Sequence, residues 1–186
     1  MINKPFYLIL HHSATRDDYV LSNFEAIKRY HMSYAIDGYT VSREEYFKQK
    51  KKDPNRYYKP AWSDIGYHAV IEMEQGEVKI KKGRKFDVTG AHAYQKMPDV
   101  NGNMVSINNQ SLGVCIVGNY DKTLLEEKYL KEAVGYVSLL LVLYKIPIKN
   151  VLGHNEIPGV TKSCPGNLIS MNYVRERIED HIGWLI

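Results

Sequence analysis

Apolar residues gather in short runs separated by amphipathic stretches, and two of these runs are continuous. Phe6-Tyr7-Leu8-Ile9-Leu10 and the run within Ser111–Gly118 consist mostly of strand-forming residues. A continuous run of this length predicts a strand that is buried on both faces. A third strand is expected over 66–73, with a hairpin partner at 78–80. A short strand at 150–152 completes the set.

Helical spacing marks three further segments. Ser22-Asn23-Phe24-Glu25 has the pattern of a capping box and predicts a helix that continues to about Met32. Thr123-Leu124-Leu125-Glu126 has the same pattern and predicts the start of the longest helix, which ends near Tyr144. The buried stripe of that helix is expected to contain Leu130, Val134, Val137 and Leu141. The last helix is expected over 170–182, with Val174 and Ile178 facing inward.

Strands and helices therefore alternate along the chain, with one hairpin in the middle. This order predicts an α/β fold: a single domain over 1–186, with a mixed central β-sheet flanked by α-helices. Residues 33–62 lack a clear period, and we expect a surface insertion there with a short helix near Arg43–Lys51. Residues 94–110 are polar and contain Asn and Gly, so a long loop is expected.

The charge pattern adds one open question. The chain has 186 residues and a formal net charge of +4, which favours an anionic partner surface without identifying it. Nucleic acid, a membrane and a teichoic-acid-bearing cell wall are all compatible. A basic run follows the first helix, with Lys48, Lys50, Lys51, Lys52, Arg56 and Lys59. A solvated face is the commoner role of such a run, and a docking patch for an anionic polymer is the sharper alternative.

The N-terminal residues and the apolar runs are informative about the cellular location of the protein. The N-terminal residues 1–5 contain no signal-peptide hydrophobic region, and the most apolar run, 137–144, is too short to span a bilayer. We therefore expect a chain made in the cytoplasm, with no membrane span. Cys115 lies inside an apolar run and is expected to be a buried core residue, which argues against a disulfide with Cys164.

Candidate chemistry centres on the segment 153–166, whose prolines and glycines predict a loop with stiff corners. It carries His154 and Cys164, two ligand types that suit zinc. A third ligand can come from His11 or His12, which follow a core strand. Because alternate strand residues point to opposite faces, only one of the two histidines can face a shared site.

His11, His154 and Cys164 would leave a fourth zinc position open, as in catalytic zinc sites. Two neutral imidazoles and one thiolate leave such a centre with a net positive charge, which lowers the pKa of bound water and polarises a carbonyl. Taken singly, each of the seven histidines is more often an ordinary core or surface residue. We assign that ordinary role to His12, His31 and His181.

Six segments in order make the chain similar to the zinc-dependent N-acetylmuramoyl-L-alanine amidases of type 2, the family of phage endolysins and peptidoglycan recognition proteins. The segments are His11-His12-Ser13-Ala14-Thr15, Trp62-Ser63-Asp64-Ile65-Gly66-Tyr67-His68, Gly90-Ala91-His92-Ala93, Asn109-Gln110-Ser111-Leu112-Gly113-Val114, Gly153-His154-Asn155-Glu156 and Lys162-Ser163-Cys164-Pro165-Gly166. The resemblance extends from Tyr7 to about Ile178. The stretch before Trp62 is longer than in a minimal member of the family, which bears on substrate preference.

The resemblance implies one Zn²⁺ held by His11, His154 and Cys164. It implies catalytic roles for Tyr67 and Lys162 and a place in the substrate groove for His92. Trp62 and Asn109, which lie in the shared motifs, are expected to contact substrate.

Glu156 has two open roles. It either takes part in catalysis directly or orders the loop and holds a ligand histidine from behind.

The implied activity is hydrolysis of the amide between N-acetylmuramic acid and L-alanine in peptidoglycan, by a monomeric cell-wall lytic enzyme of phage or bacterial origin that reaches the wall after release. Three alternatives remain. The first is a cytoplasmic amidase that recycles anhydro-muropeptides, and the second is a peptidoglycan-binding module without hydrolysis. The third, a nucleic-acid binder, is not expected and would require affinity that falls steeply with salt.

Overall fold

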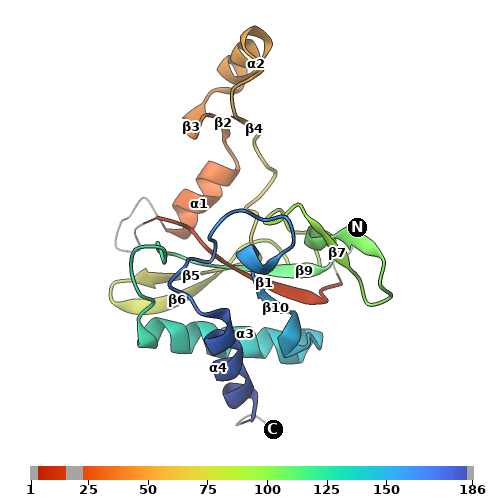
Figure 1. Cartoon of the computed structure of the whole chain (residues 1–186). Helices are drawn as coiled ribbons and strands as arrows, with labels where there is room; N and C mark the ends of the chain where they lie inside the picture. The colour runs from red at the N-terminus through yellow and green to blue at the C-terminus, as the bar shows by residue number, and fades with distance from the viewer. Residues whose placement is uncertain (1–3, 16–22, 184–186) are drawn as a thin grey trace.

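A five-stranded sheet forms the centre of the computed structural model, which describes residues 4–15 and 23–183 (Figure 1). The strand order is β10-β1-β9-β5-β6. β1 pairs in parallel with β10 and β9, β9 pairs in parallel with β5, and β6 is the antiparallel edge. These strands are β1 Tyr7–His12, β5 Ala69–Glu74, β6 Glu77–Lys82, β9 Ser111–Ile116 and β10 Val151–Gly153. The predicted mixed sheet is confirmed.

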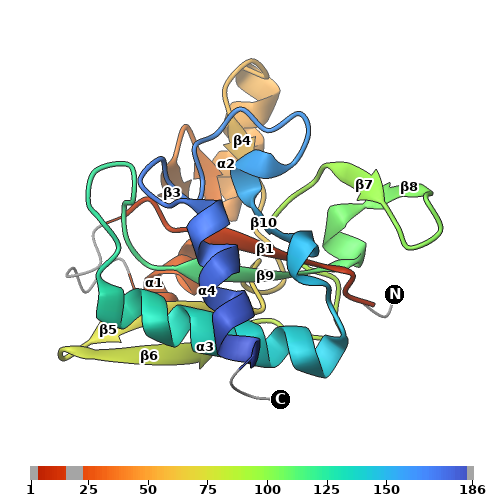
Figure 2. The same ribbon diagram turned by 60° about the horizontal axis from the view of Figure 1, so that its bottom comes forward.

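Two helices cover one face of this sheet (Figure 2). They are α3 Glu127–Tyr144 and α4 Met171–Gly183. Leu8 and Leu10 of β1 point into this layer, and the main hydrophobic cluster joins them to residues of α3 and α4. All four residues of the predicted α3 stripe are buried, as are Val174 and Ile178. No helix within the described ranges is long and apolar enough to cross a bilayer.

The opposite face of the sheet carries the intervening residues of the same strands. Ile9 belongs to one small cluster there, and Val70 and Cys115 belong to another. The helix α1, Phe24–His31, packs on this face through Phe24 and Ile27. Cys115 is buried in β9 and is a free thiol, as predicted. This face has less helical cover than the other, which leaves room for a site above the sheet.

Residues 33–62 are more regular than the sequence indicated. They form β2 Tyr34–Ile36, β3 Tyr39–Val41, α2 Arg43–Lys52 and β4 Tyr58–Lys59, a unit that projects from the body of the molecule (Figure 1). Its three-stranded sheet has the order β3-β2-β4. Asp37 and Gly38 have positive φ angles of 50° and 89° and form the tight turn of the β2–β3 hairpin. Strands this short carry no readable alternation, which explains why the sequence reading missed them.

The expected long loop at 94–110 also contains regular structure. It forms a hairpin of β7 Lys96–Pro98 and β8 Met104–Ser106, followed by a 3₁₀ turn at Ile107–Asn109. Side chains of the body hold this hairpin in place. The Tyr7 hydroxyl donates to the Pro98 carbonyl at 2.9 Å, and the Gln110 amide donates to the Met97 carbonyl at 3.0 Å.

The predicted capping box at Thr123 is wrong. The Thr123 hydroxyl donates to the Asn119 carbonyl at 3.1 Å, and α3 begins at Glu127 with no side-chain cap on Glu126. At α1, the capping residue is Asn23, whose side chain accepts from the Ala26 amide at 3.1 Å. Ser22, the cap expected from the sequence, lies outside the described residues.

Candidate metal centre and its cleft

Three side chains from distant parts of the chain converge above the second face of the sheet. His11 comes from the end of β1, His154 follows β10, and Cys164 lies in the loop that leads to α4. One potential ligand atom from each lies within 4.8 Å of the others. Because β1 and β10 are parallel neighbours, their carboxyl ends meet at one edge of the sheet, and this brings the two histidines together.

His11 is oriented by His92. The His11 Nε2 and His92 Nδ1 atoms are 3.0 Å apart, and His11 Nδ1 lies 3.5 Å from Cys164 Sγ. His11 is 1% exposed, and burial together with the neighbouring His92 lowers its pKa well below the usual value. Neutral His11 therefore offers one nitrogen to His92 and the other to the cluster.

A chain of hydrogen bonds determines which nitrogen carries the proton. The Ser111 hydroxyl donates its one proton to the Ile107 carbonyl at 2.6 Å. It must then accept from His92 Nε2, which lies 3.3 Å away. This leaves His92 Nδ1 as an acceptor for the Nε2 proton of His11, so that the lone pair of His11 Nδ1 faces the cluster.

His154 and Cys164 have the properties expected of metal ligands. Nε2 of His154 is buried and has no hydrogen-bond partner among the residues that the structure describes. Burial, with a smaller effect of Lys162, lowers the pKa of His154 to about 4. Burial raises the pKa of the Cys164 thiol to about 11. A metal ion would satisfy the unpartnered nitrogen and displace the thiol proton, so this set of donors fits Zn²⁺.

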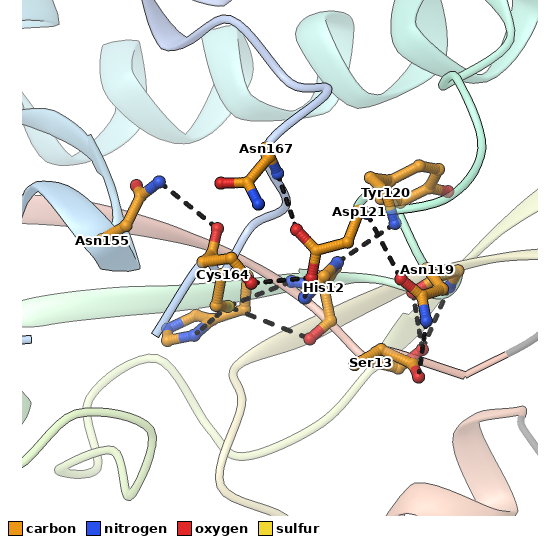
Figure 3. A network of polar contacts seen from close by, with 12 residues as sticks. His12, Ser13, Asn119, Tyr120, Asp121, Asn155, Cys164 and Asn167 are labelled. Carbon is orange, nitrogen blue, oxygen red and sulfur yellow. Dashed lines mark hydrogen bonds and ion pairs between the residues drawn. The ribbon is translucent and has the colours of Figure 1, made fainter. Parts of the chain in front are cut away.

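The loop of Cys164 is held by a network of polar contacts (Figure 3). The His12 backbone N–H donates to Cys164 Sγ at 3.4 Å, and the Asn155 N–H donates to the Cys164 carbonyl at 2.6 Å. Asp121 accepts from the Ser163 hydroxyl at 2.7 Å and from the Asn167 N–H at 2.8 Å. These contacts fix the position of the thiol relative to β1.

The imidazole of His12 points to the other face, where its Nδ1 accepts from the Tyr120 N–H at 3.2 Å.

Tyr67 and Lys162 lie beside the cluster. The Tyr67 ring centre is 5.1 Å from that of His11, and burial raises the pKa of its hydroxyl well above the usual value. Tyr67 is therefore neutral, and in this structure its hydroxyl forms a hydrogen bond with the buried Cys115 side chain and does not line the cleft. Lys162 is exposed. Its positive charge adds to the lowering of the His154 pKa and partly offsets the effect of burial on the pKa of Cys164.

Glu156 points away from the cluster. Its carboxylate accepts from the Gly153 N–H at 2.8 Å and forms a two-pronged ion pair with Arg175 of α4, at 2.9 and 3.0 Å. Of the two roles open from the sequence, this geometry favours ordering of the loop that carries His154.

A cleft of about 380 Å³ adjoins the cluster. Four parts of the chain line it, and they contribute Tyr57, Trp62, Ala91, His92, Ala93, Tyr94, Gln95, Asn108, His154, Gly159, Val160, Thr161 and Lys162. Trp62 and His92 thus lie where substrate contacts were expected. Asn109 is not among the lining residues. Its neighbour Asn108 is, because the 3₁₀ turn directs adjacent side chains differently, and Asn108 Oδ1 accepts from the His92 N–H at 3.0 Å.

Two residues near the cleft were missed by the sequence reading. His31, to which only an ordinary role was given, lies with its ring centre 4.6 Å from Trp62 and 5.4 Å from Tyr67. Its Nδ1 accepts from the Gly66 N–H at 3.1 Å, and this bond holds the imidazole in contact with the rings of Trp62 and Tyr67. Tyr57 lines the cleft from the projecting unit. Its place depends on the fold of that unit, and no local pattern in the sequence signals it.

Comparison with known proteins gives three results. The family model described as N-acetylmuramoyl-L-alanine amidase matches residues 2–167. Peptidoglycan-recognition protein SC2 of Drosophila simulans and of Drosophila melanogaster is 31% identical over 109 residues, which is 58% of this chain. The chain spans about half the length of these curated relatives, of which 50% is covered.

Among solved structures, N-acetylmuramoyl-L-alanine amidase LysC from Clostridium intestinale URNW matches with a TM-score of 0.59 and 19% identity, over 95% of this chain and 87% of that chain. AMPDH3 from Pseudomonas aeruginosa, in complex with anhydromuramic pentapeptide, also has a TM-score of 0.59, with 16% identity over 95% of this chain and 61% of that one. At these identities the likeness shows the shared fold.

Proposed function

Because the chain belongs to the N-acetylmuramoyl-L-alanine amidase family, we propose that it is a zinc-dependent peptidoglycan hydrolase. It cleaves the amide bond between the lactyl group of N-acetylmuramic acid and L-alanine. The single observation that carries this proposal is the convergence of His11, His154 and Cys164 at the end of a cleft. Peptidoglycan is then its partner, and we propose that it acts as a monomer.

Different residues of the chain have different roles in the proposed reaction. His11 Nδ1, His154 Nε2 and the Cys164 thiolate would hold one Zn²⁺, which supplies a Lewis acid and a water of lowered pKa. Tyr67 donates a hydrogen bond towards the reacting carbonyl or orients the attacking water. Lys162 places a positive charge where the tetrahedral oxygen becomes negative. Asp121 and His92 keep the thiol and the first imidazole in position.

Two related activities remain as alternatives. A cytoplasmic amidase of anhydro-muropeptides would use the same residues, and the structural match to AMPDH3 in complex with anhydromuramic pentapeptide supports testing it. A binding module without hydrolysis would need no metal. The cysteine at position 164 and the unpartnered nitrogen of His154 favour an enzyme.

The test measures bound zinc and release of stem peptide from purified peptidoglycan. We expect the wild type to bind one zinc per chain and to release peptide. Cys164→Ala should lose both. His181→Ala is the control, because it also removes a potential ligand side chain but lies on α4, outside the cluster. A Cys164→Ala protein that is folded and still releases peptide at the wild-type rate would overturn the proposal. Parallel assays on intact sacculi and on soluble anhydro-muropeptides separate the lytic role from the recycling role.

A further inference from the structure

The projecting unit is fixed to the body by a buried lysine. Lys59 of β4 is 5% exposed, and its ammonium group donates to the carbonyls of Tyr30, His31 and Ser33 at 2.8, 3.0 and 2.8 Å. The charge also lies 5.3 Å from the ring centre of Trp62. The carbonyls of Tyr30 and His31 belong to the last turn of α1, where a cation is favourable. The unit is therefore anchored to the helix beside the cleft.

A second set of contacts fixes the strand that leads into Lys59. Asp37 accepts from the Tyr57 N–H at 3.0 Å and from Arg56 Nε at 2.7 Å, while the Asp37 N–H donates to the Tyr57 carbonyl at 2.9 Å. Both polar groups of the Tyr57 backbone are thus held by one residue of the β2–β3 turn. The Tyr57 ring is left free for contacts, and it lines the cleft while remaining 66% exposed.

Tyr57 and Trp62 line one side of the cleft with aromatic rings, and the Lys59 ammonium near Trp62 is bound to backbone carbonyls and does not line the cleft. The Trp62 ring packs against His31, with 4.6 Å between ring centres, and the backbone N–H of Trp62 donates to the His31 carbonyl at 2.9 Å. Lys162 is the one charged side chain among the described residues that line the cleft, and it belongs to a different segment. An aromatic surface whose backbone is held in place suits the apolar C–H face of a sugar ring better than the carboxylates of a stem peptide.

We propose that Tyr57 is a specificity-determining residue that packs against the saccharide part of the substrate. The inference rests on the proposed function, because it takes the substrate to be a muropeptide in which sugar and peptide meet at the scissile amide. It assigns a role to the unit 33–62, which we propose is an insertion that completes one wall of the cleft. The peptide part lies towards Lys162.

The test is a binding measurement that does not need hydrolysis. Protein treated with a chelator is titrated in a calorimeter with a soluble disaccharide-peptide and, separately, with the free stem peptide. We expect Tyr57→Ala to weaken binding of the disaccharide-peptide roughly 3- to 10-fold, the range of a lost aromatic packing contact. Binding of the free peptide should not change. Tyr57→Phe, which keeps the ring, should bind both ligands within about twofold of the wild type.

Tyr39→Ala is the matched control, since Tyr39 is 78% exposed on β3 of the same unit and does not line the cleft. Equal weakening of both ligands by Tyr57→Ala would show that the residue holds peptide and would overturn the saccharide assignment. Unchanged binding of both, or a wild type that binds neither, would overturn the proposed wall. Binding with the expected pattern but no peptide release by the zinc-loaded wild type would instead refute the hydrolase proposal and leave the wall in place.

Discussion

His92 Nδ1 lies 3.0 Å from His11 Nε2, so that a residue outside the metal cluster decides which nitrogen of His11 faces it. Hydrogen-bond partners behind a metal ligand typically contribute 10- to 100-fold in metal affinity. We expect His92→Leu to raise the dissociation constant for Zn²⁺ by about that factor. The measurement is a competition titration with a chelator. His181→Leu is the control on α4, and an unchanged constant in His92→Leu would contradict the orienting role.

Gly113 of β9 gives the same imidazole its space. A Cβ atom at this position would lie 2.5 Å from His92 Cγ and Cδ2, and a real contact of that length does not occur. We expect Gly113→Ala to shift the ring, to weaken zinc binding and to lower the free energy of unfolding by about 1–3 kcal/mol. Urea denaturation of the chelated protein measures the second effect.

Gly135→Ala is a control that should raise the free energy of unfolding, whereas Gly113→Ala should lower it. Among the residues that the structure describes, a Cβ added at Gly135 would meet only His181, at 3.7 Å, in the interior of α3. We expect this variant to gain up to about 1 kcal/mol in unfolding free energy from helix propensity. A Gly113→Ala protein as stable as the wild type would refute the packing argument.

The pair of Glu156 and Arg175 separates loop ordering from catalysis. If Glu156 only ties the His154 loop to α4, then Glu156→Ala and Arg175→Ala remove the same ion pair. Both should lower the free energy of unfolding by about 1–2 kcal/mol and reduce peptide release by the same modest factor. A rate for Glu156→Ala that is at least about 100-fold below that of Arg175→Ala would assign the carboxylate to catalysis.

Acid should destabilise the metal-free protein through His68. This residue is 0% exposed, and burial lowers its pKa to about 4. The unfolded chain takes up the proton near pH 6.5, whereas the folded chain does so only near pH 4, so stability falls as the pH drops between these values. His68 alone contributes roughly 3 kcal/mol to this loss.

Urea denaturation at pH 7.5 and pH 4.5 measures how much unfolding free energy the metal-free protein loses on acidification. His68→Gln should be less stable than the wild type at the higher pH, because the Gly113 N–H donates to His68 Nδ1 at 2.9 Å in the wild type. It should nevertheless lose less stability on acidification. An equal loss in the two proteins would show that His68 does not titrate as described.

The central sheet and its main helices could be predicted from the sequence, because continuous apolar runs indicate buried strands and apolar residues at helical spacing indicate amphipathic helices. Strand alternation also predicts that His11 and His12 point to opposite faces of the sheet. Prediction from the sequence was wrong or incomplete where short elements depend on contacts with distant residues. The strands of 33–62 have two or three residues, and the cap at Thr123 is replaced by a bond to Asn119.

The candidate cleft shows the same limit. Tyr57 lines it through its ties to Asp37, twenty residues earlier in the chain. Asn108, and not Asn109, lines it because of a single 3₁₀ turn. Neither fact can be read from residue order, because each depends on how a turn directs a side chain.

Strand β1 ends with His11 directed at the cluster and His12 directed at the backbone of Tyr120. Deleting one residue between Tyr7 and Leu10 would preserve both histidines and almost the whole apolar run, yet it would exchange their directions. Such a chain would keep every residue of the candidate centre and lose the centre itself. Natural variants of this strand should therefore differ in side-chain identity and keep the same length.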